Sequence, residues 1–103
     1  MDTTLGIDLG TQSLKVVFYD YEAREVVASA SAPLEVMRDT TGRAEQEASW
    51  WLVALKQALQ QVSASVRMTA RAVAVSGQQH GFVPIDADGE VLHAVKLWCD
   101  TAT

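Results

Sequence analysis

The chain has 103 residues with 49% hydrophobic content, which suits one small folded α/β domain and excludes a disordered chain. Its 13 acidic and 8 basic residues give a net charge of −5 without a basic cluster, so we expect no nucleic-acid partner. One cysteine excludes an internal disulfide, and residues 1–4 lead into no long apolar run, so we expect a cytoplasmic protein without a signal peptide or a membrane partner.

The first third of the chain predicts three strands joined by short turns. Apolar residues first alternate with small or polar ones, and β-branched and aromatic residues dominate the segments that follow. Connections this short favour an antiparallel meander. The predicted strands are residues 5–9, 14–19 and 25–31.

The rest of the chain predicts a loop at residues 38–43, one main helix at residues 48–66 and then short strands. The first strand after the helix should lie parallel to the first strand of the chain, which makes the sheet mixed. An Asp-Gly pair at residues 88–89 predicts a hairpin turn between two of the later strands. These strands are predicted at residues 71–76, 82–85, 91–93 and 95–98.

The turn between the first two predicted strands, Asp-Leu-Gly-Thr-Gln-Ser at residues 8–13, has the composition of a phosphate-binding loop. Glycine lets backbone N–H groups approach phosphate oxygens, and hydroxyl groups add donors. Asp8, at the carboxyl end of a strand, can hold Mg²⁺ directly or through water. By itself this composition is equally compatible with an ordinary tight turn that binds no ligand. The candidate phosphate- and magnesium-binding residues are Asp8, Gly10, Thr11, Gln12, Ser13 and Lys15.

Polar residues follow the strand predicted at 71–76, where α/β sheets usually bind ligands. Gly-Gln-Gln-His-Gly occupies residues 77–81, and Leu-Trp-Cys-Asp follows at residues 97–100. Amide, imidazole and carboxylate groups suit a polyol, and a tryptophan offers a flat face to its carbons. The residues alone favour a tight turn and a core tryptophan, with Cys99 packed. The candidate sugar-binding residues are Gln79, His80, Gly81, Trp98 and Asp100.

A third segment, Gly-Arg-Ala-Glu-Gln-Glu-Ala-Ser-Trp-Trp at residues 42–51, precedes and starts the predicted helix. Its two tryptophans are interpreted as core residues. Glu45 either tethers the loop before the helix or faces a ligand cleft, and the sequence leaves both open.

Together the three segments resemble known motifs. The loop at residues 8–13 resembles the first phosphate motif of the actin/hexokinase/Hsp70-like superfamily. Residues 42–51 resemble the G-W-x-E-Q-D-P-x-x-W-W segment of FGGY carbohydrate kinases, with Arg43, Glu47 and Ala48 departing from it. Residues 77–81 and 97–100 are similar to the xylulokinase branch, in which many members have Met at position 79.

The resemblance implies an α/β, ribonuclease-H-like domain with a mixed sheet and one main helix. Residues 1–103 would be the N-terminal part of the first FGGY kinase domain, with the second domain and the general-base Asp beyond Thr103. It implies ATP-dependent phosphorylation of a sugar hydroxyl with Mg²⁺, first of all D-xylulose to D-xylulose 5-phosphate. Gln79, His80 and Asp100 would contact the pentulose. A homodimer of the complete enzyme is one state that the resemblance allows.

Two alternatives remain open. One is a chaperone or filament ATPase of the same superfamily, which the loop at residues 8–13 permits. The other is a non-enzymatic domain that binds a partner through an unfinished sheet edge. In the kinase interpretation we expect residues 1–103 to be inactive alone, because phosphoryl transfer requires both substrates and Mg²⁺ to be positioned together.

Overall fold

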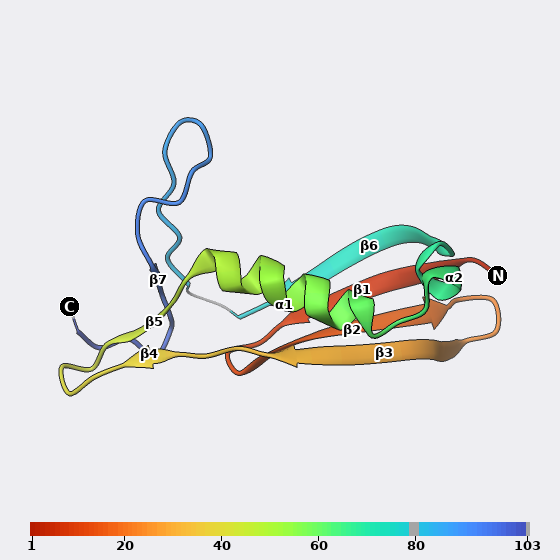
Figure 1. Ribbon diagram of the computed structural model, residues 1–103, viewed down its shortest axis with the longest axis horizontal. Helices are drawn as coiled ribbons and strands as arrows, with labels where there is room; N and C mark the ends of the chain where they lie inside the picture. Colours follow the sequence, from red (N-terminus) through yellow and green to blue (C-terminus); the bar gives the residue numbers. More distant parts are fainter. Residues whose placement is uncertain (79–80, 103) are drawn as a thin grey trace.

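The longest strands of the chain form one mixed sheet. The computed structural model describes residues 1–78 and 81–102. Four strands pair in the order β3-β2-β1-β6 (Figure 1). β1, β2 and β3 are antiparallel neighbours and β6 runs parallel to β1, which confirms the predicted meander and the parallel return. Their bounds are β1 Thr3–Leu9, β2 Ser13–Asp20, β3 Glu25–Pro33 and β6 Ala70–Gly77.

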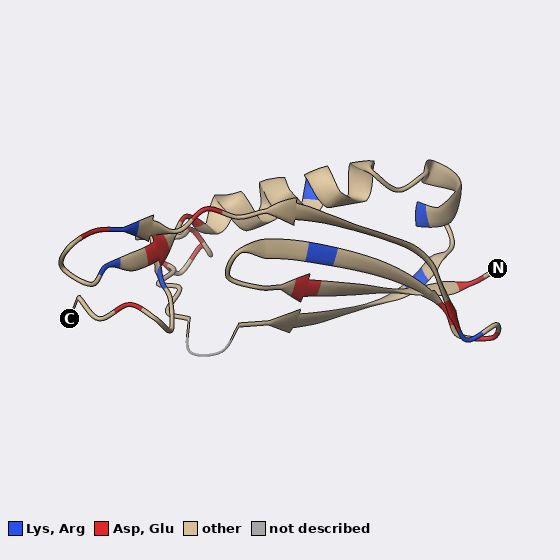
Figure 2. Ribbon diagram, turned by 90° about the horizontal axis from the view of Figure 1, so that it is seen from below, with Lys and Arg blue, Asp and Glu red and all other residues tan. Residues whose placement is uncertain are grey.

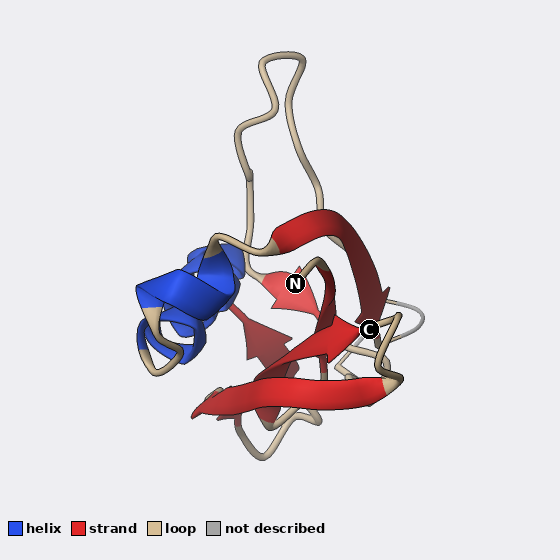
Figure 3. Cartoon of the chain, turned by 90° about the vertical axis from the view of Figure 1, so that its right-hand side faces the viewer, coloured by secondary structure: helices blue, strands red, loops and turns tan. Residues whose placement is uncertain are grey.

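Helix α1 (Ala48–Gln60) covers one face of this sheet, and the short helix α2 (Ala64–Arg67) lies on the same side (Figure 3). Alternate residues of β2 point toward α1 because successive strand residues face opposite sides. Phe18, 1% exposed, is the largest of them and packs with Ala54 and Ala58 of α1. The opposite face of the sheet therefore remains open for other contacts.

The helix predicted over residues 48–66 was wrong in its length. The N–H groups of Gln61 and Val62 bond to carbonyls three residues back, which ends α1. Ser63 then adopts an extended backbone, and its side chain accepts a hydrogen bond from Val66 N–H to start α2. Serine is a preferred N-cap, so this local hydrogen bond competes with continuation of the helix.

Three short strands form a second sheet in the order β4-β5-β7. They are β4 Met37–Arg38, β5 Ala44–Gln46 and β7 Val95–Lys96, so the loop expected at 38–43 begins inside β4. A small core of Ala44, Val95 and Leu97 lies beneath them, and half-buried Cys99 packs against it, which confirms the expected packing of that thiol.

The arm at residues 82–94 projects from the body beside α1 (Figure 1). The strands predicted there do not form; only single bridges join Phe82 to Lys96 and Ile85 to Val91. The Asp86 carboxylate instead accepts hydrogen bonds from the N–H groups of Asp88 and Glu90 at the tip. The predicted Asp-Gly turn does form: the N–H of Gly89 bonds to the Asp86 carbonyl at 3.1 Å, and the N–H of Asp86 bonds to the Glu90 carbonyl at 2.9 Å. A hairpin of two strands is at best marginally stable by itself, so the ladder beyond the turn stays short.

β6 is an edge strand of the described sheet, and Val73 and Val75 on it are 60% and 69% exposed. Among the helices of residues 1–78 and 81–102, none has the length and apolar character needed to span a bilayer.

Candidate functional site

The first candidate ligand residues lie on the open face of the main sheet. Strand register places Asp8 of β1 opposite Lys15 of β2 and beside Ser76 of β6. With Gly6 and Val17 they line a shallow hollow of about 290 Å³. Charged residues are otherwise sparse along the long strands and gather toward the ends of the molecule (Figure 2). This hollow thus pairs one carboxylate and one ammonium in an apolar surround.

The phosphate loop, defined as residues 8–13, closes tightly at its second half. The N–H of Gly10 bonds to the Ser13 carbonyl at 3.0 Å. A Cβ atom at position 10 would lie 3.1 Å from that same oxygen, so the closure favours glycine. Gln12 and Ser13 are exposed at the turn. The loop therefore presents its backbone and short polar side chains to solvent, as a phosphate site requires.

Thr11 connects this loop to both halves of the candidate sugar-binding segment. Its hydroxyl donates to Gln78 Oε1 at 3.1 Å and accepts from the Trp98 indole Nε1 at 3.1 Å. Trp98 is 60% exposed, so it is not a core tryptophan and its ring remains available to a ligand. The loop at residues 8–13 is thus joined at Thr11 to Gln78 and Trp98, one from each half of the candidate sugar-binding segment.

Gln46, which the sequence interpretation did not assign to the site, lies at the centre of the region. It is completely buried. Its Nε2 donates to the carbonyls of Thr11 at 2.7 Å and Glu35 at 2.9 Å, and its Oε1 accepts from Trp51 Nε1 at 2.9 Å. The Glu-Gln pair before the Trp-Trp helix was the signal that could have identified it. Trp50 and Trp51 pack against the main core, as expected.

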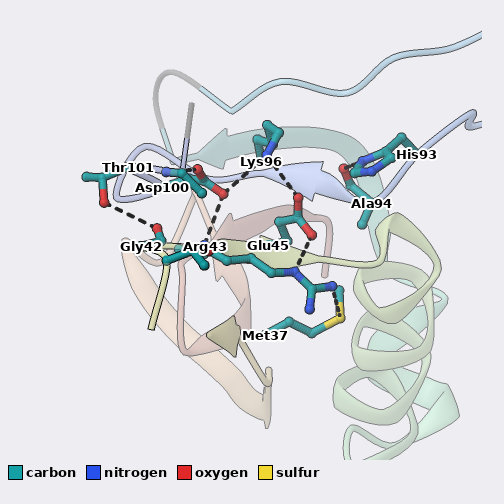
Figure 4. Close-up of polar contacts among 12 residues, drawn as sticks. Met37, Gly42, Arg43, Glu45, His93, Ala94, Lys96, Asp100 and Thr101 are labelled. Carbon is teal, nitrogen blue, oxygen red and sulfur yellow. Dashed lines mark hydrogen bonds and ion pairs between the residues drawn. The ribbon is translucent and has the colours of Figure 1, made fainter. Parts of the chain in front are cut away.

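Of the two alternatives for Glu45, the structure shows the tether and not a carboxylate that faces a ligand cleft (Figure 4). Its side chain is 5% exposed and pairs with Arg43 Nε at 2.6 Å and Lys96 Nζ at 3.1 Å. These hydrogen bonds, that of Arg43 first, hold the pKa of the Glu45 carboxyl below its usual range. The carboxylate therefore ties β5 to β7, two strands of the small sheet.

Asp100 has a structural role that the sequence did not reveal. Its side chain is 3% exposed, and Oδ2 accepts from Ala44 N–H at 3.0 Å while Oδ1 accepts from Ala102 N–H at 2.9 Å. Lys96 Nζ lies 3.6 Å from Oδ2. The two backbone donors are the main cause of a lowered pKa for this carboxyl. Each carboxylate oxygen can accept more than one hydrogen bond, so a sugar contact stays a prediction.

Gln79, His80 and Gly81 are the remaining candidates for the sugar site. Gln79 and His80 lie outside the described residues. Gly81 is exposed, and a Cβ there would meet only Val95 at an ordinary contact distance of 3.9 Å. Close backbone packing therefore does not explain a glycine at position 81.

Comparison with known proteins places this geometry in a family. The sequence model of the FGGY family of carbohydrate kinases, N-terminal domain, matches residues 3–103. A xylulose kinase from Haemophilus influenzae is 39% identical over an alignment of 106 positions, which covers 96% of this chain and 22% of that protein.

Solved structures of carbohydrate kinases also resemble this chain. One described as a xyloylose kinase from Brucella ovis superimposes with a TM-score of 0.87 at 34% identity, over 96% of this chain and 21% of that one. A gluconate kinase from Lactobacillus acidophilus gives a TM-score of 0.81 at 25% identity, over 96% of this chain and 20% of that one.

The chain spans about a fifth of the length of these relatives. Its mixed sheet and main helix are those of the actin/hexokinase-like ATPase fold that these kinases share, as expected from the sequence. The chain therefore belongs to the FGGY family of carbohydrate kinases, and its residues 3–103 match the N-terminal domain of that family.

Proposed function

We propose that this chain is the N-terminal part of a longer ATP-dependent sugar kinase that converts D-xylulose to D-xylulose 5-phosphate. The observation that carries the proposal is the hydrogen bond from Trp98 to Thr11, because it joins the predicted sugar-binding segment to the phosphate loop. The name of the Haemophilus relative supports xylulose as the sugar. The family match gives no support to a chaperone or filament ATPase.

The phosphate loop is proposed to hold ATP phosphates through backbone N–H groups and the hydroxyls of Thr11 and Ser13, with Lys15 nearby as a positive charge. When bound, Mg²⁺ neutralises charge on the transferred phosphoryl group. Within the described residues no three acidic, histidine or cysteine side chains cluster as a metal site. Asp8 is therefore proposed to act as a single carboxylate ligand, directly or through water, with phosphate oxygens completing the shell.

The sugar is proposed to lie beside Trp98, with its hydroxyl and carbonyl oxygens bonded by Gln79, His80 and Asp100 and with Gly81 as a neighbour. The exposed indole face suits the carbon chain of a pentulose. The Asp100 carboxylate, held ionised by two backbone donors, would accept from sugar hydroxyls more strongly than a neutral group. The general-base Asp is proposed to lie beyond Thr103.

The test is a substrate panel on the complete kinase that contains this segment, with D-xylulose, L-xylulose, D-ribulose, L-ribulose, glycerol and gluconate. We expect the highest kcat/KM with D-xylulose, and no turnover by residues 1–103 alone. Preference for glycerol or gluconate would overturn the pentulose assignment. A complete protein that neither binds sugar in a titration nor hydrolyses ATP would favour the non-enzymatic alternative, in which β6 pairs with a partner strand.

A further inference from the structure

We propose that Gln46 is a positioning residue for the nucleotide: it orients the phosphate loop so that backbone N–H groups point toward the ATP phosphates. The inference rests on the proposed nucleotide role of that loop. Gln46 lies outside the loop, 35 positions along the chain from Thr11. Its side chain is buried, and its amide reaches the loop backbone.

The carbonyl groups of residues 10–12 in the loop accept hydrogen bonds from outside the loop. The Thr11 carbonyl accepts from Gln46 Nε2 at 2.7 Å, and the Gln12 carbonyl accepts from Leu34 N–H at 2.9 Å. The Gly10 carbonyl has a longer contact with Gln78 Nε2 at 3.5 Å. Three successive carbonyls are thus held by groups from outside the loop, and the shortest of these bonds is the one from Gln46.

Peptide geometry sets the direction of the Gln12 N–H. A trans peptide is planar, and its C=O and N–H point in opposite directions. No cis peptide occurs among the described residues. Because Gln46 fixes the Thr11 carbonyl on the protein side, the N–H of Gln12, in the same peptide, must point away from Gln46. Gln12 is exposed at the turn, and its N–H donates to no group among the described residues.

The N–H groups of Thr11 and Gln12 are the loop donors whose direction this anchoring sets. Within the part of the chain that the structure describes, no hydrogen bond is made by the N–H of Thr11 or Gln12. Successive outward N–H groups form an anion-binding concavity. Their direction is set in advance of ligand binding only if the loop carbonyls stay anchored. Gln46 therefore preorganises the donors, and a misaligned loop loses affinity for phosphate rather than for sugar.

Gln46 is itself held at its other end. Trp51 of α1 donates to Oε1 at 2.9 Å, and Nε2 makes a second bond to the Glu35 carbonyl at 2.9 Å. Gln78 Nε2 makes a longer contact with Oε1 at 3.5 Å. With these partners the amide cannot flip or swing without leaving a buried polar group unpaired, which is costly. The loop is consequently anchored to the helix-sheet core.

The experiment compares Gln46→Met with the unmodified complete kinase. Methionine keeps the volume but donates no hydrogen bond to the Thr11 carbonyl. We expect the Kd for Mg-ADP, measured by calorimetry without sugar, and the KM for ATP to rise about tenfold or more. The KM for D-xylulose should change less than about twofold to threefold. The hydrogen bonds that the structure describes for Gln46 go to the loop, Glu35, Trp51 and Gln78, none of which is a proposed sugar-binding residue.

The matched control is Gln61→Met. Gln61 also donates from Nε2 to a backbone carbonyl, that of Ser31 at 2.8 Å, but it lies exposed at the far end of α1. It should leave ADP and sugar binding unchanged. Folded Gln46→Met protein with unaltered ADP affinity, or with equal losses for ADP and sugar, would overturn the positioning role.

If Gln46→Met does not fold, Gln46→Glu serves as the second variant. A buried carboxyl beside two carbonyl oxygens has a raised pKa and donates one hydrogen bond only when protonated. We expect its ADP affinity to fall as pH rises from 6 to 9, while the unmodified enzyme shows no such fall. A flat pH profile would overturn the inference. An unmodified kinase that binds no ADP would overturn the proposed function together with it.

Discussion

The indole Nε1 of Trp98 donates a hydrogen bond to the hydroxyl of Thr11 at 3.1 Å, across 87 residues of sequence. We expect Trp98→Phe and Thr11→Val each to raise the KM for ATP about fivefold, the value of one neutral hydrogen bond of about 1 kcal/mol. The double variant should lose little more than either single one, giving a coupling energy of about 0.5–1.5 kcal/mol in a mutant cycle. Strict additivity of the two losses would show that this bond does not link the two segments.

Asp8→Ala should lower kcat of the complete kinase by roughly 10²-fold or more, with the Kd for sugar nearly unchanged. The reason is that contacts to Mg²⁺ and the transferring phosphate act mainly in the transition state. Steady-state kinetics with D-xylulose and a sugar titration measure the two effects. Asp2→Ala is the control, because Asp2 is an exposed residue before β1 that pairs with Arg71. An unaffected kcat in Asp8→Ala would contradict the assignment of the phosphate loop.

Asp100→Ala should raise the KM for D-xylulose roughly ten- to a hundredfold, because sugar hydroxyls lose a charged acceptor. It should also lower thermal stability, since the N–H groups of Ala44 and Ala102 lose their partner. The two roles separate in the measurement: the melting temperature reports the backbone contacts, and the KM of the folded variant reports the sugar. A lowered melting temperature with normal KM would leave Asp100 a structural residue only. Asp88→Ala, in the exposed arm, is the neutral control.

The pairs of Glu45 predict a pH dependence of stability. The folded pKa of Glu45 lies below its usual 4.5, through Arg43 first and then Lys96. A depressed carboxyl pKa stabilises the fold fully above the unfolded pKa, and this contribution is lost as pH falls through the folded value. We expect the difference in melting temperature between the unmodified protein and Glu45→Gln to be constant from pH 6 to 8 and to shrink below about pH 4.5. A difference that grows on acidification would refute this pairing.

Local patterns in the sequence determined the strands of the main sheet and the tight turn at residues 8–13. Alternating apolar residues specified β1, because a strand with one buried face leaves a period of two in its sequence. Residues that favour strands, between short polar turns, specified β2 and β3. The crossover through a helix specified that β6 lies parallel to β1. The composition of residues 8–13 specified a tight turn, and its combination with the later motifs indicated the family.

The tertiary structure alone decided which polar groups meet. Gln46 donates to the carbonyls of Thr11 and Glu35 and accepts from Trp51. The Glu-Gln pair before the Trp-Trp helix marks the segment, but these partners lie in different parts of the sequence and no local pattern names them. Asp100 likewise has partners that packing of the small sheet brings to it. Periodicity reports which side of an element is buried, but a hydrogen bond depends on the positions of two groups within about 3 Å, which only the folded chain determines.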